Sequence, residues 1–237
     1  MPPQPGAVTV IVLTFNEAES IGAVVAELQR AVVNRVIVVD GGSRDGTQAW
    51  AKKAGADVIE VGRGYGRACL AGAEAAAPDD VLVFMDGDGA DDPAAIAAMV
   101  EAIRSGAYDF VIASRARGKR EPGSMAAHQL VAGDLAGRLT KLLYGVRYTD
   151  MCAFRAIRRD TLLKLGMREL TYGWNLEMQM RAARAGLRVL EVPVDYRRRI
   201  GGESKVAGSL RGSLKAGLRI MATFVRVALE PAGARQA

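Results

Sequence analysis

Short, almost wholly apolar runs alternate with helical patterns in the first part of the chain, and this alternation limits the folds open to it. The runs are Val8 to Leu13, Arg35 to Val39, Asp57 to Val61 and Val81 to Met85. The helical patterns extend from Asn16 to Arg30, Asp45 to Ala54 and Arg67 to Ala77. Strands that are apolar on both faces are typical of a parallel sheet covered by helices on both sides. The sequence therefore predicts an α/β fold built on a parallel sheet.

Polar residues follow these strands where ligands bind in such folds. In open α/β sheets, ligands collect at the carboxyl ends of the strands. Polar clusters stand directly after predicted strands at Thr14 to Glu17, Asp40 to Ser43 and Asp86 to Asp92, so one pocket could gather all three. Beyond about residue 115 the pattern is less regular. Further strands are predicted at Phe110 to Ser114, Cys152 to Ile157 and Val189 to Val194.

The composition limits the cellular compartments and the classes of binding partner that fit this chain. The 237 residues fit one large α/β domain or two small ones. The two cysteines, Cys69 and Cys152, are too few and too far apart for a disulfide framework or a zinc cluster, which favours a reducing compartment and buried thiols. A formal charge of +6 favours an anionic partner, for which nucleic acid, a phosphorylated substrate and an acidic membrane surface all qualify. Aromatic residues are only 5% of the chain, which argues against a nucleic-acid surface with stacking platforms.

Membrane and export signals are not apparent in the sequence. No apolar run approaches the roughly 18 residues that a membrane span requires. The opening MPPQPG lacks the charged and apolar regions of a signal peptide. We therefore expect a cytoplasmic protein, with any membrane attachment peripheral or through a partner.

Asp86-Gly87-Asp88 places two carboxylates on one short turn after a buried strand. Hard oxygen ligands suit Mg²⁺ or Mn²⁺, which keep open positions that substrate phosphate oxygens can fill. Gly87 would let the backbone pass close to a ligand. Acids and glycine also populate ordinary turns, but the position after a buried strand favours a metal site. A cation bound there would stabilise a leaving diphosphate.

Two further segments offer groups to a nucleotide, and each has a structural alternative. Asp40 ends a strand in VVDGGSRDGT, where its carboxylate could accept hydrogen bonds from a base or ribose, whereas helix capping suits Ser43 and Asp45 better. Glu17 could cap the first helix or contact the nucleotide. The glycine-rich turn Gly62 to Arg67 opens a helix whose free N–H groups and two arginines could face a diphosphate, or it is a plain flexible loop.

In this order, the segments LTFNE, VVDGGSRDGT and FMDGDGADDP resemble the opening of a family 2 glycosyltransferase with the GT-A fold. Further on, RIGGESK is similar to the segment that polyprenyl-phosphate sugar synthases, such as dolichol-phosphate mannose synthase, carry after the GT-A core. The resemblance covers about residues 8 to 210. It implies a Rossmann-like, mostly parallel sheet flanked by helices, with a GT-A catalytic domain over residues 1–208 and a C-terminal amphipathic helix and tail over residues 209–237.

The resemblance also implies roles for individual residues. The nucleotide site would include Leu13, Thr14, Phe15, Glu17, Asp40, Asp86 and Gly87, to which the glycine-rich turn adds Gly66 and Arg67. The metal would be held by Asp86 and Asp88, with Asp91 as a candidate further ligand. Acceptor or phosphate contacts would come from Ser114, Arg115, Asp150, Arg199, Ser204 and Lys205. The catalytic residues would be Asp88, Glu177 and Arg199.

Several positions depart from the family pattern. Leu13 stands where a proline is often found and Gly41 where a second aspartate is often found, which leaves base recognition open. Ala90 replaces a glutamine that the synthases often carry two positions after the second metal aspartate. Asp91 or Asp92 could supply the missing oxygen ligand, including through water.

Glu177, in WNLE, lies where many inverting family members place an acid that deprotonates an acceptor hydroxyl. A sugar hydroxyl must lose a proton during attack, so a carboxylate base would help. A phosphate monoester, whose second pKa is about 6, is already a nucleophile at neutral pH, so Glu177 would then only orient groups. Its structural alternative is a salt-bridged helix residue among Arg181 and Arg184.

Two segments outside these motifs have open roles. His128 follows a basic stretch and a predicted mobile loop, GKREPGSM, and is expected at the surface or at the acceptor site. The tail from Ser209 to Leu229 places apolar residues among four basic residues at roughly helical spacing. Such a helix could lie on an anionic membrane surface, pack on the core or pack on a second subunit. Membrane contact is slightly favoured because an isoprenoid acceptor would reside there.

The leading hypothesis is an inverting transferase, dependent on Mg²⁺ or Mn²⁺, that moves mannose or glucose from a nucleotide-diphosphate sugar to polyprenyl phosphate. The donor would be GDP-mannose or UDP-glucose. The first alternative acts on a soluble or sugar hydroxyl acceptor with Glu177 as general base. The second is a non-catalytic module that binds phosphate or nucleic acid. The base, the sugar and the oligomeric state, including a homodimer, stay open.

Overall fold

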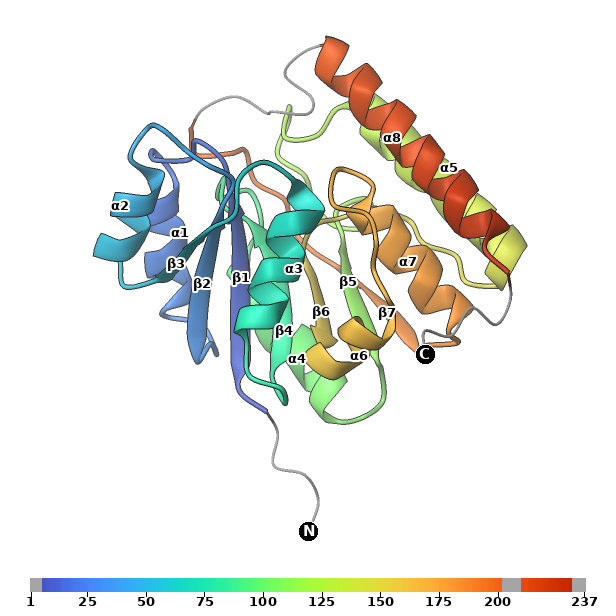
Figure 1. Cartoon of the computed structure of the whole chain (residues 1–237), viewed down its shortest axis with the longest axis horizontal. Helices are drawn as coiled ribbons and strands as arrows, with labels where there is room; N and C mark the ends of the chain where they lie inside the picture. The colour runs from blue at the N-terminus through green and yellow to red at the C-terminus, as the bar shows by residue number, and fades with distance from the viewer. Residues whose placement is uncertain (1–5, 202–209, 232–237) are drawn as a thin grey trace.

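A seven-stranded sheet with the strand order β3-β2-β1-β4-β6-β5-β7 forms the centre of the molecule (Figure 1). The computed structural model describes residues 6–201 and 210–231, except for the side chains of residues 210–215. The strands are β1 (Val8–Thr14), β2 (Arg35–Asp40), β3 (Asp57–Glu60), β4 (Val81–Asp86), β5 (Phe110–Ser114), β6 (Arg155–Arg158) and β7 (Val189–Pro193). The first four strands pair in parallel, and so do β5 and β7, which confirms a mostly parallel sheet.

Strand β6 departs from the predicted parallel pattern. It runs antiparallel to both of its neighbours, β4 and β5, and its pairing begins at Arg155 rather than at Cys152. The reason is the return of the chain along α5 (Ala127–Tyr144). A Cβ on Gly137 would meet the Tyr148 carbonyl oxygen, and one on Gly133 would meet the Asp150 Cα, so the segment after α5 runs back along that helix. Because this segment returns to the carboxyl edge of the sheet, the next strand has to run in the opposite direction.

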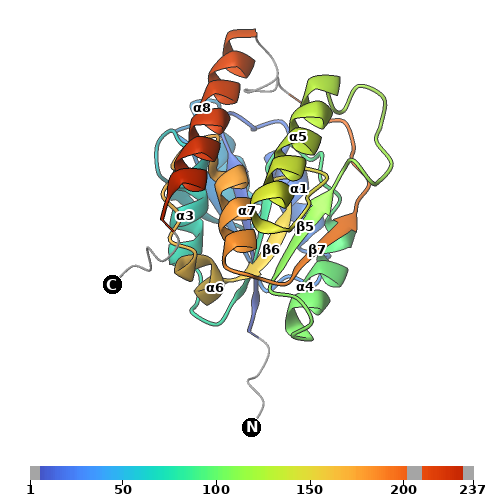
Figure 2. The same ribbon diagram turned by 90° about the vertical axis from the view of Figure 1, so that its right-hand side faces the viewer.

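Helices cover both faces of the sheet and bury its apolar strands. The remaining helices are α1 (Ile21–Leu28), α2 (Thr47–Lys53), α3 (Tyr65–Ala75), α4 (Ile96–Arg104), α6 (Arg159–Lys164), α7 (Trp174–Arg184) and α8 (Leu210–Leu229), with a 3₁₀ turn at Pro93–Ala95. Helices α3 and α4 lie on opposite sides of the sheet (Figure 2). All seven residues of β1 are buried, as a strand covered on both faces requires. Cys69 and Cys152 are both buried and unpaired, as predicted.

The C-terminal helix predicted from the sequence is present as α8 and packs on α7. Leu176 and Met180 of α7 form a small buried cluster with Val227 of α8. In Figure 2, α7 lies between α8 and α5. None of the helices in the described part of the chain is long and apolar enough to span a membrane. The contact with α7 thus holds α8 on the body of the fold.

Candidate active site

Three strands end side by side at the carboxyl edge of the sheet. In the strand register, Thr14 of β1 is opposite Asp40 of β2, and Leu13 of β1 is opposite Asp86 of β4. The polar clusters that follow these strands in the sequence are therefore brought to one edge, as predicted. This carboxyl edge is the candidate active site.

Gly87 allows the turn after β4 to pass directly against β1. Its N–H donates to the Leu13 carbonyl oxygen at 2.9 Å. A Cβ at this position would lie 2.5 Å from the Thr14 methyl group. Leu13 and Thr14 are themselves buried. The close approach that the glycine permits is therefore to β1, and a ligand contact of Gly87, Leu13 or Thr14 stays a prediction.

Asp86, Asp88 and Asp91 crowd their charges into the turn after β4. Burial, followed by the charges of Asp88 and Asp91, raises the pKa of Asp86 well above its usual range. Burial and the charge of Asp88 raise the pKa of Asp91 to about 7. Carboxylates held together in this way form an oxygen donor set that suits a hard divalent cation.

This turn is an open candidate metal site rather than a closed one. Within residues 6–201 and 210–231, no three Asp, Glu, His or Cys side chains form a preformed metal cluster. The Asp91 carboxylate lies 3.5 Å from the backbone nitrogen of Asp86, so it is placed beside the turn. Mg²⁺ is usually bound through one or two carboxylates together with substrate phosphates. Asp86 and Asp88 fit that role, and Asp91 fits as an additional or water-mediated ligand.

We expect the metal-free protein to be more stable at about pH 5.5 than at about pH 7.5 by about 2 kcal/mol. Asp91 has a folded-state pKa of about 7, raised from 3.8. A raised carboxyl pKa contributes stability that is full below the unfolded pKa and is lost as the pH rises through the folded pKa. Denaturant unfolding in EDTA at the two pH values measures the difference. Asp91→Asn should flatten the dependence, and stability that rises between these pH values would contradict the assignment.

Arg115 is held against the acidic turn by a buried ion pair. Its backbone N–H, Nε and Nη2 all donate to the Asp150 carboxylate, at 2.8 to 2.9 Å. Its guanidinium carbon lies 5.0 Å from the centroid of the Tyr196 ring. Arg115 lowers the pKa of both Asp86 and Asp91, against the larger effect of burial. Arg115 thus lies beside the candidate metal site, and its hydrogen bonds to Asp150 fix the orientation of its guanidinium.

Ser114, the other predicted phosphate contact on β5, is fully buried. Its hydroxyl lies 2.7 Å from the Thr149 hydroxyl. A direct contact between Ser114 and a substrate stays a prediction that this geometry does not support. Tyr196, by contrast, was not singled out from the sequence. The signal in the sequence that could have indicated this residue is its position directly before three arginines, Arg197 to Arg199.

Residues 196–201, here called the strap, cross the acidic turn. The Arg197 N–H donates to the Ala90 carbonyl oxygen and the Ile200 N–H donates to the Asp88 carbonyl oxygen, both at 2.9 Å. The Arg199 guanidinium donates to both oxygens of Glu17, at 2.7 and 2.9 Å. Burial lowers the pKa of Arg199, but the hydrogen bond and charge of Glu17, followed by the charge of Asp88, outweigh burial and raise this pKa above its usual range. Arg199 is therefore held between the first loop and the metal turn, where an anionic ligand would meet it.

Asp40 uses its carboxylate to shape its own loop. It accepts hydrogen bonds from the Ser43 hydroxyl, from the N–H groups of Ser43 and Gly42, at 2.7 and 3.0 Å, and from the side chains of Gln48 and Thr14. Burial raises its pKa, but these hydrogen bonds outweigh burial and the pKa is lowered. The predicted contact with a base or ribose stays a prediction. Phe15, next along the first loop, has the Arg63 guanidinium 4.0 Å from its ring centroid.

The glycine-rich turn before α3 packs against the loop before α7. The Arg67 N–H donates to the Leu170 carbonyl oxygen at 3.1 Å. A Cβ on Gly66 would lie 2.1 Å from the Glu169 carbonyl oxygen, and one on Gly64 would lie 2.7 Å from that of Leu170. These glycines make room for the loop before α7 rather than for a diphosphate. The assignment of Gly66 and Arg67 to the nucleotide site is therefore not supported.

Glu177 is fully buried, and both of its carboxylate oxygens are engaged. One oxygen accepts from the N–H groups of Arg168 and Glu169, at 3.0 and 2.6 Å. The other accepts from Arg181 and Arg226, at 2.9 and 3.0 Å. A general base has to reach the proton that it removes. The geometry supports the salt-bridged alternative, with Arg226 of α8 in place of the expected Arg184.

Ser204 and Lys205 lie outside the described residues. Their predicted contacts with phosphate stay predictions. His128 lies on the exposed surface of α5, as one of its two interpretations predicted.

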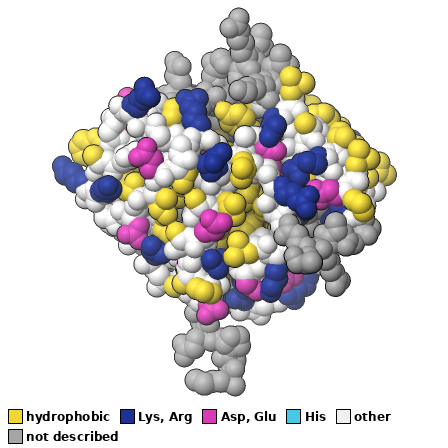
Figure 3. Space-filling view, in the orientation of Figure 1, with side chains coloured by type: hydrophobic (Ala, Val, Ile, Leu, Met, Phe, Trp, Pro, Cys, Tyr) yellow, Lys and Arg dark blue, Asp and Glu magenta, His cyan; other side chains and the backbone are white. Residues whose placement is uncertain are grey.

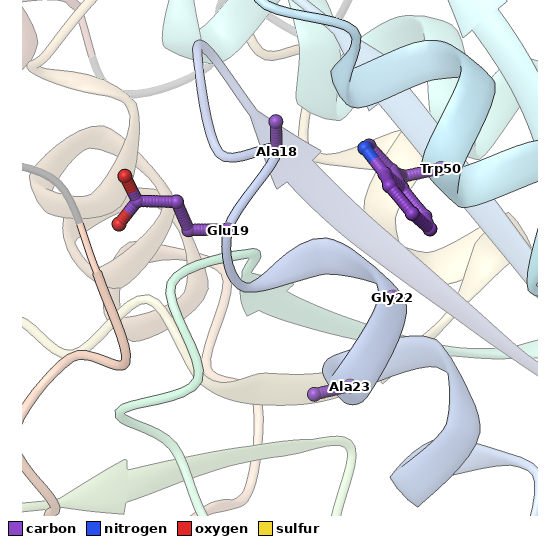
Figure 4. A pocket seen from close by; sticks show the side chains of 5 residues that line it. All are labelled: Ala18, Glu19, Gly22, Ala23 and Trp50. Carbon is purple, nitrogen blue, oxygen red and sulfur yellow. The ribbon is translucent and has the colours of Figure 1, made fainter.

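A pocket lies at the start of α1, next to Trp50 of α2. Ala18, Glu19, Gly22, Ala23 and Trp50 line it. Figure 4 shows the Trp50 ring facing α1, while the Glu19 side chain points away from that ring. The lining does not include the acids of the acidic turn after β4, nor Arg115 or Arg199. It is therefore not part of the candidate active site.

Comparison with known proteins decides the family. The family model described as Glycosyl transferase family 2 matches residues 9–166, which is more than half of the chain. The chain belongs to glycosyl transferase family 2. It is a glycosyltransferase, and the resemblance found in its motifs is confirmed. The matched range includes Asp86, Asp88, Arg115 and Asp150.

Two of its relatives have names that state a polyprenyl-phosphate acceptor or product. An undecaprenyl-phosphate mannosyltransferase of Micrococcus luteus is 35% identical over 223 residues, with 86% of this chain and 89% of that protein covered. A polyprenol monophosphomannose synthase of Mycolicibacterium smegmatis is 32% identical, with 84% and 81% covered. An uncharacterized glycosyltransferase of Mycobacterium tuberculosis is 38% identical, with 89% and 94% covered.

Solved structures support the fold. Glucosyl-3-phosphoglycerate synthase from Mycobacterium tuberculosis, crystallised with Mn²⁺ and UDP-glucose, has a TM-score of 0.75 at 22% identity, with 95% of this chain and 80% of that chain covered. This similarity confirms the predicted GT-A architecture. At this identity it does not extend to substrates.

Proposed function

We propose that this glycosyltransferase moves a hexose from a nucleotide-diphosphate sugar to polyprenyl phosphate at the cytoplasmic face of a membrane, with a divalent cation and inversion at the sugar carbon. The names of the relatives from Micrococcus luteus and Mycolicibacterium smegmatis support a lipid-phosphate acceptor. The observation that carries the proposal is the meeting of Asp86 and Asp88 with Arg115 and Arg199 at one edge of the sheet. Acids for a cation and arginines for phosphates are the two parts that such a transfer requires.

The proposed roles follow from position. Asp86 and Asp88 would hold Mg²⁺ or Mn²⁺, which supplies charge stabilisation to the leaving diphosphate. Arg115, oriented by Asp150, lies beside the same acids and would bind a diphosphate oxygen. Arg199 lies on the strap side of the turn and would exchange Glu17 for an acceptor phosphate oxygen. That oxygen would form the bond to the anomeric carbon while the bond to the diphosphate breaks.

The acceptor chemistry fits the position of Glu177, the base expected for a hydroxyl acceptor. A phosphate oxygen carries no proton that must be removed at neutral pH, because its second pKa is about 6. Glu177, the candidate base for a hydroxyl acceptor, is engaged by four donors. The hydroxyl-acceptor alternative therefore has less support than the phosphate acceptor.

The test is transfer from radiolabelled GDP-mannose or UDP-glucose to undecaprenyl phosphate in detergent, with soluble hydroxyl acceptors offered in parallel. We expect label in the organic phase, only when Mg²⁺ or Mn²⁺ is present. The donor that supplies the label identifies the sugar. Label that appears only on a water-soluble product would refute the lipid-phosphate acceptor.

Arg199→Gln should reduce this transfer by about a hundredfold, because a charge-assisted hydrogen bond to a phosphate contributes about 2 to 3 kcal/mol. Arg198→Gln is the matched control, since Arg198 is exposed and its Nε donates to the Pro122 carbonyl oxygen instead. Initial rates at varied acceptor concentration measure both variants. Equal rates in the two variants would remove Arg199 from the acceptor site.

A further inference from the structure

Helix α8 exposes an apolar stripe on its outward side. The side chains of Leu218, Met221, Val225 and Leu229 are 65%, 53%, 48% and 78% exposed. Their spacing places them along one side of a helix. The described arginines of α8 do not share this stripe, because they reach the buried acids beneath the helix. A surface helix normally shows the reverse arrangement, with charges outward and apolar residues inward.

Helix α5 repeats this arrangement. Its outward side exposes Val131, Leu135 and Leu142. Its inward side consists of small residues, since Gly133 and Gly137 lie against the returning chain. The exposed apolar residues are therefore not needed for the packing of α5 on the core. Exposed apolar side chains of this kind favour contact with a further apolar surface.

The two apolar stripes belong to helices that both pack on α7. Ala136 and Tyr144 of α5 pack with Ile220 and Phe224 of α8 around one small buried cluster. Eight of the fourteen exposed large hydrophobic side chains in the described residues lie on these two helices, which are only part of the surface. Figure 3 shows hydrophobic side chains along the margin where Figure 1 draws α8 and α5. We call this surface the α5–α8 face.

The charges around this face are mainly basic. Between Leu210 and Leu229 the sequence contains four basic residues and no acidic one. On α5, Arg138 and Lys141 are exposed, and the only acidic residue of that helix is Asp134. On α5 the apolar stripe is thus bordered by exposed Lys and Arg, which is the pattern of helices that lie in the interface of an anionic bilayer. The charge complementarity favours lipid over a second copy of this basic chain.

The α5–α8 face also continues to the candidate active site. The loop before α7 exposes Leu170 and Tyr172. The Leu170 carbonyl oxygen accepts from the Arg67 N–H at the start of α3, on the carboxyl side of the sheet. The neighbouring Thr171 hydroxyl lies 3.2 Å from Arg219 Nε on α8. One loop therefore joins the exposed apolar surface to the edge that carries the metal turn.

We infer that the outward sides of α5 and α8 form one surface that docks on an anionic phospholipid bilayer, with α5 as an equal part of it. The apolar side chains enter the boundary between headgroups and acyl chains, and the exposed Arg138 and Lys141 of α5 contact lipid phosphates. Arg219 and Arg226 of α8 stay paired with the buried acids. Delivery of a lipid-linked acceptor to the carboxyl edge by this docking rests on the proposed function. The docking itself does not, because it requires no acceptor and no donor.

The test is co-sedimentation of the protein with vesicles of phosphatidylcholine, with and without phosphatidylglycerol, in the absence of polyprenyl phosphate. We expect binding to the mixed vesicles that weakens at high salt and without the anionic lipid. Leu218→Glu with Val225→Glu on α8, and Leu135→Glu with Leu142→Glu on α5, should each weaken binding roughly tenfold or more. Val32→Glu, at an exposed apolar residue outside this face, is the matched control and should bind normally.

Two further measurements keep the result interpretable. Hydrogen exchange of the unaltered protein should slow in α5 and α8 when vesicles are added. This measurement does not depend on the folding of any variant. Light scattering reports the oligomeric state without lipid. Three outcomes would overturn the inference. The first is loss of binding in the α8 variant alone, and the second is equal binding to vesicles without anionic lipid. The third is a stable dimer, dissociated by the α5 and α8 variants, in a protein that does not bind vesicles. Vesicle binding without sugar transfer would leave it intact and refute only the proposed acceptor.

Discussion

Asp88→Asn is expected to reduce kcat/KM for sugar transfer by about a thousandfold, or about 4 kcal/mol of transition-state stabilisation. Asp88 raises the pKa of both Asp86 and Asp91, so its charge is central to the acidic turn. An asparagine keeps the size of the side chain but removes the charge that would hold the cation. Initial rates at saturating Mn²⁺ measure the effect, and a titration of Mn²⁺ shows whether the loss comes from weaker metal binding.

The matched control for this variant is Asp79→Asn. Asp79 is exposed and precedes the same strand, β4, at its opposite end. Asp79→Asn should keep full activity. Asp88→Asn should have an unchanged circular dichroism spectrum, which shows that it is folded. The unfolding temperature of Asp88→Asn in EDTA should not fall, since a repulsive charge has been removed. Full activity of Asp88→Asn with EDTA-treated enzyme would exclude the proposed metal site.

Glu177→Gln is expected to lower the free energy of unfolding by about 3 kcal/mol while kcat changes by no more than a few-fold. The carboxylate lies beneath the contact of α7 with α8 and pairs with Arg181 and Arg226. Breaking a buried ion pair leaves the partner charges uncompensated. Arg226 is partly exposed, so water offsets part of that loss and the lower end of the usual range applies. Urea unfolding and transfer kinetics at a temperature where the variant is folded measure the two effects separately.

Glu101→Gln is the control, because Glu101 is an exposed helix glutamate on α4. It should change neither stability nor rate. The hydroxyl-acceptor alternative makes the opposite prediction for Glu177→Gln. A loss of kcat by two or more orders of magnitude, with stability unchanged, would restore Glu177 as a general base.

Much of the N-terminal half could be predicted because its signals are local. The strands β1, β2 and β4 are apolar runs bounded by polar turns, and each lies within a residue of its predicted bounds. Their parallel pairing follows from the alternation with helices. Since parallel strands share a carboxyl edge, the turn at Asp86 and the loop at Asp40 had to meet there. The family and the enzyme class rest on the same local motifs.

The second half was harder to predict, because its structure depends on contacts between distant segments. The direction of β6 follows from packing of the returning chain on Gly133 and Gly137, and no short pattern announces that contact. The helices α4 and α5 were also not predicted as elements. Helix α5 packs through glycines and exposes its larger apolar residues, so the usual periodicity does not show its buried side.

The sequence by itself determined the family, the α/β class and the acidic turn proposed to bind the metal, because strand burial, turn chemistry and acidic pairs are properties of short segments. Only the tertiary structure decided which groups face which. It placed Arg199 against Glu17, which are 182 positions apart in the chain, and it enclosed Glu177 among donors from three segments. A side chain's charge can be read from the chain, but its partners depend on which distant segments the packing of the core brings beside it.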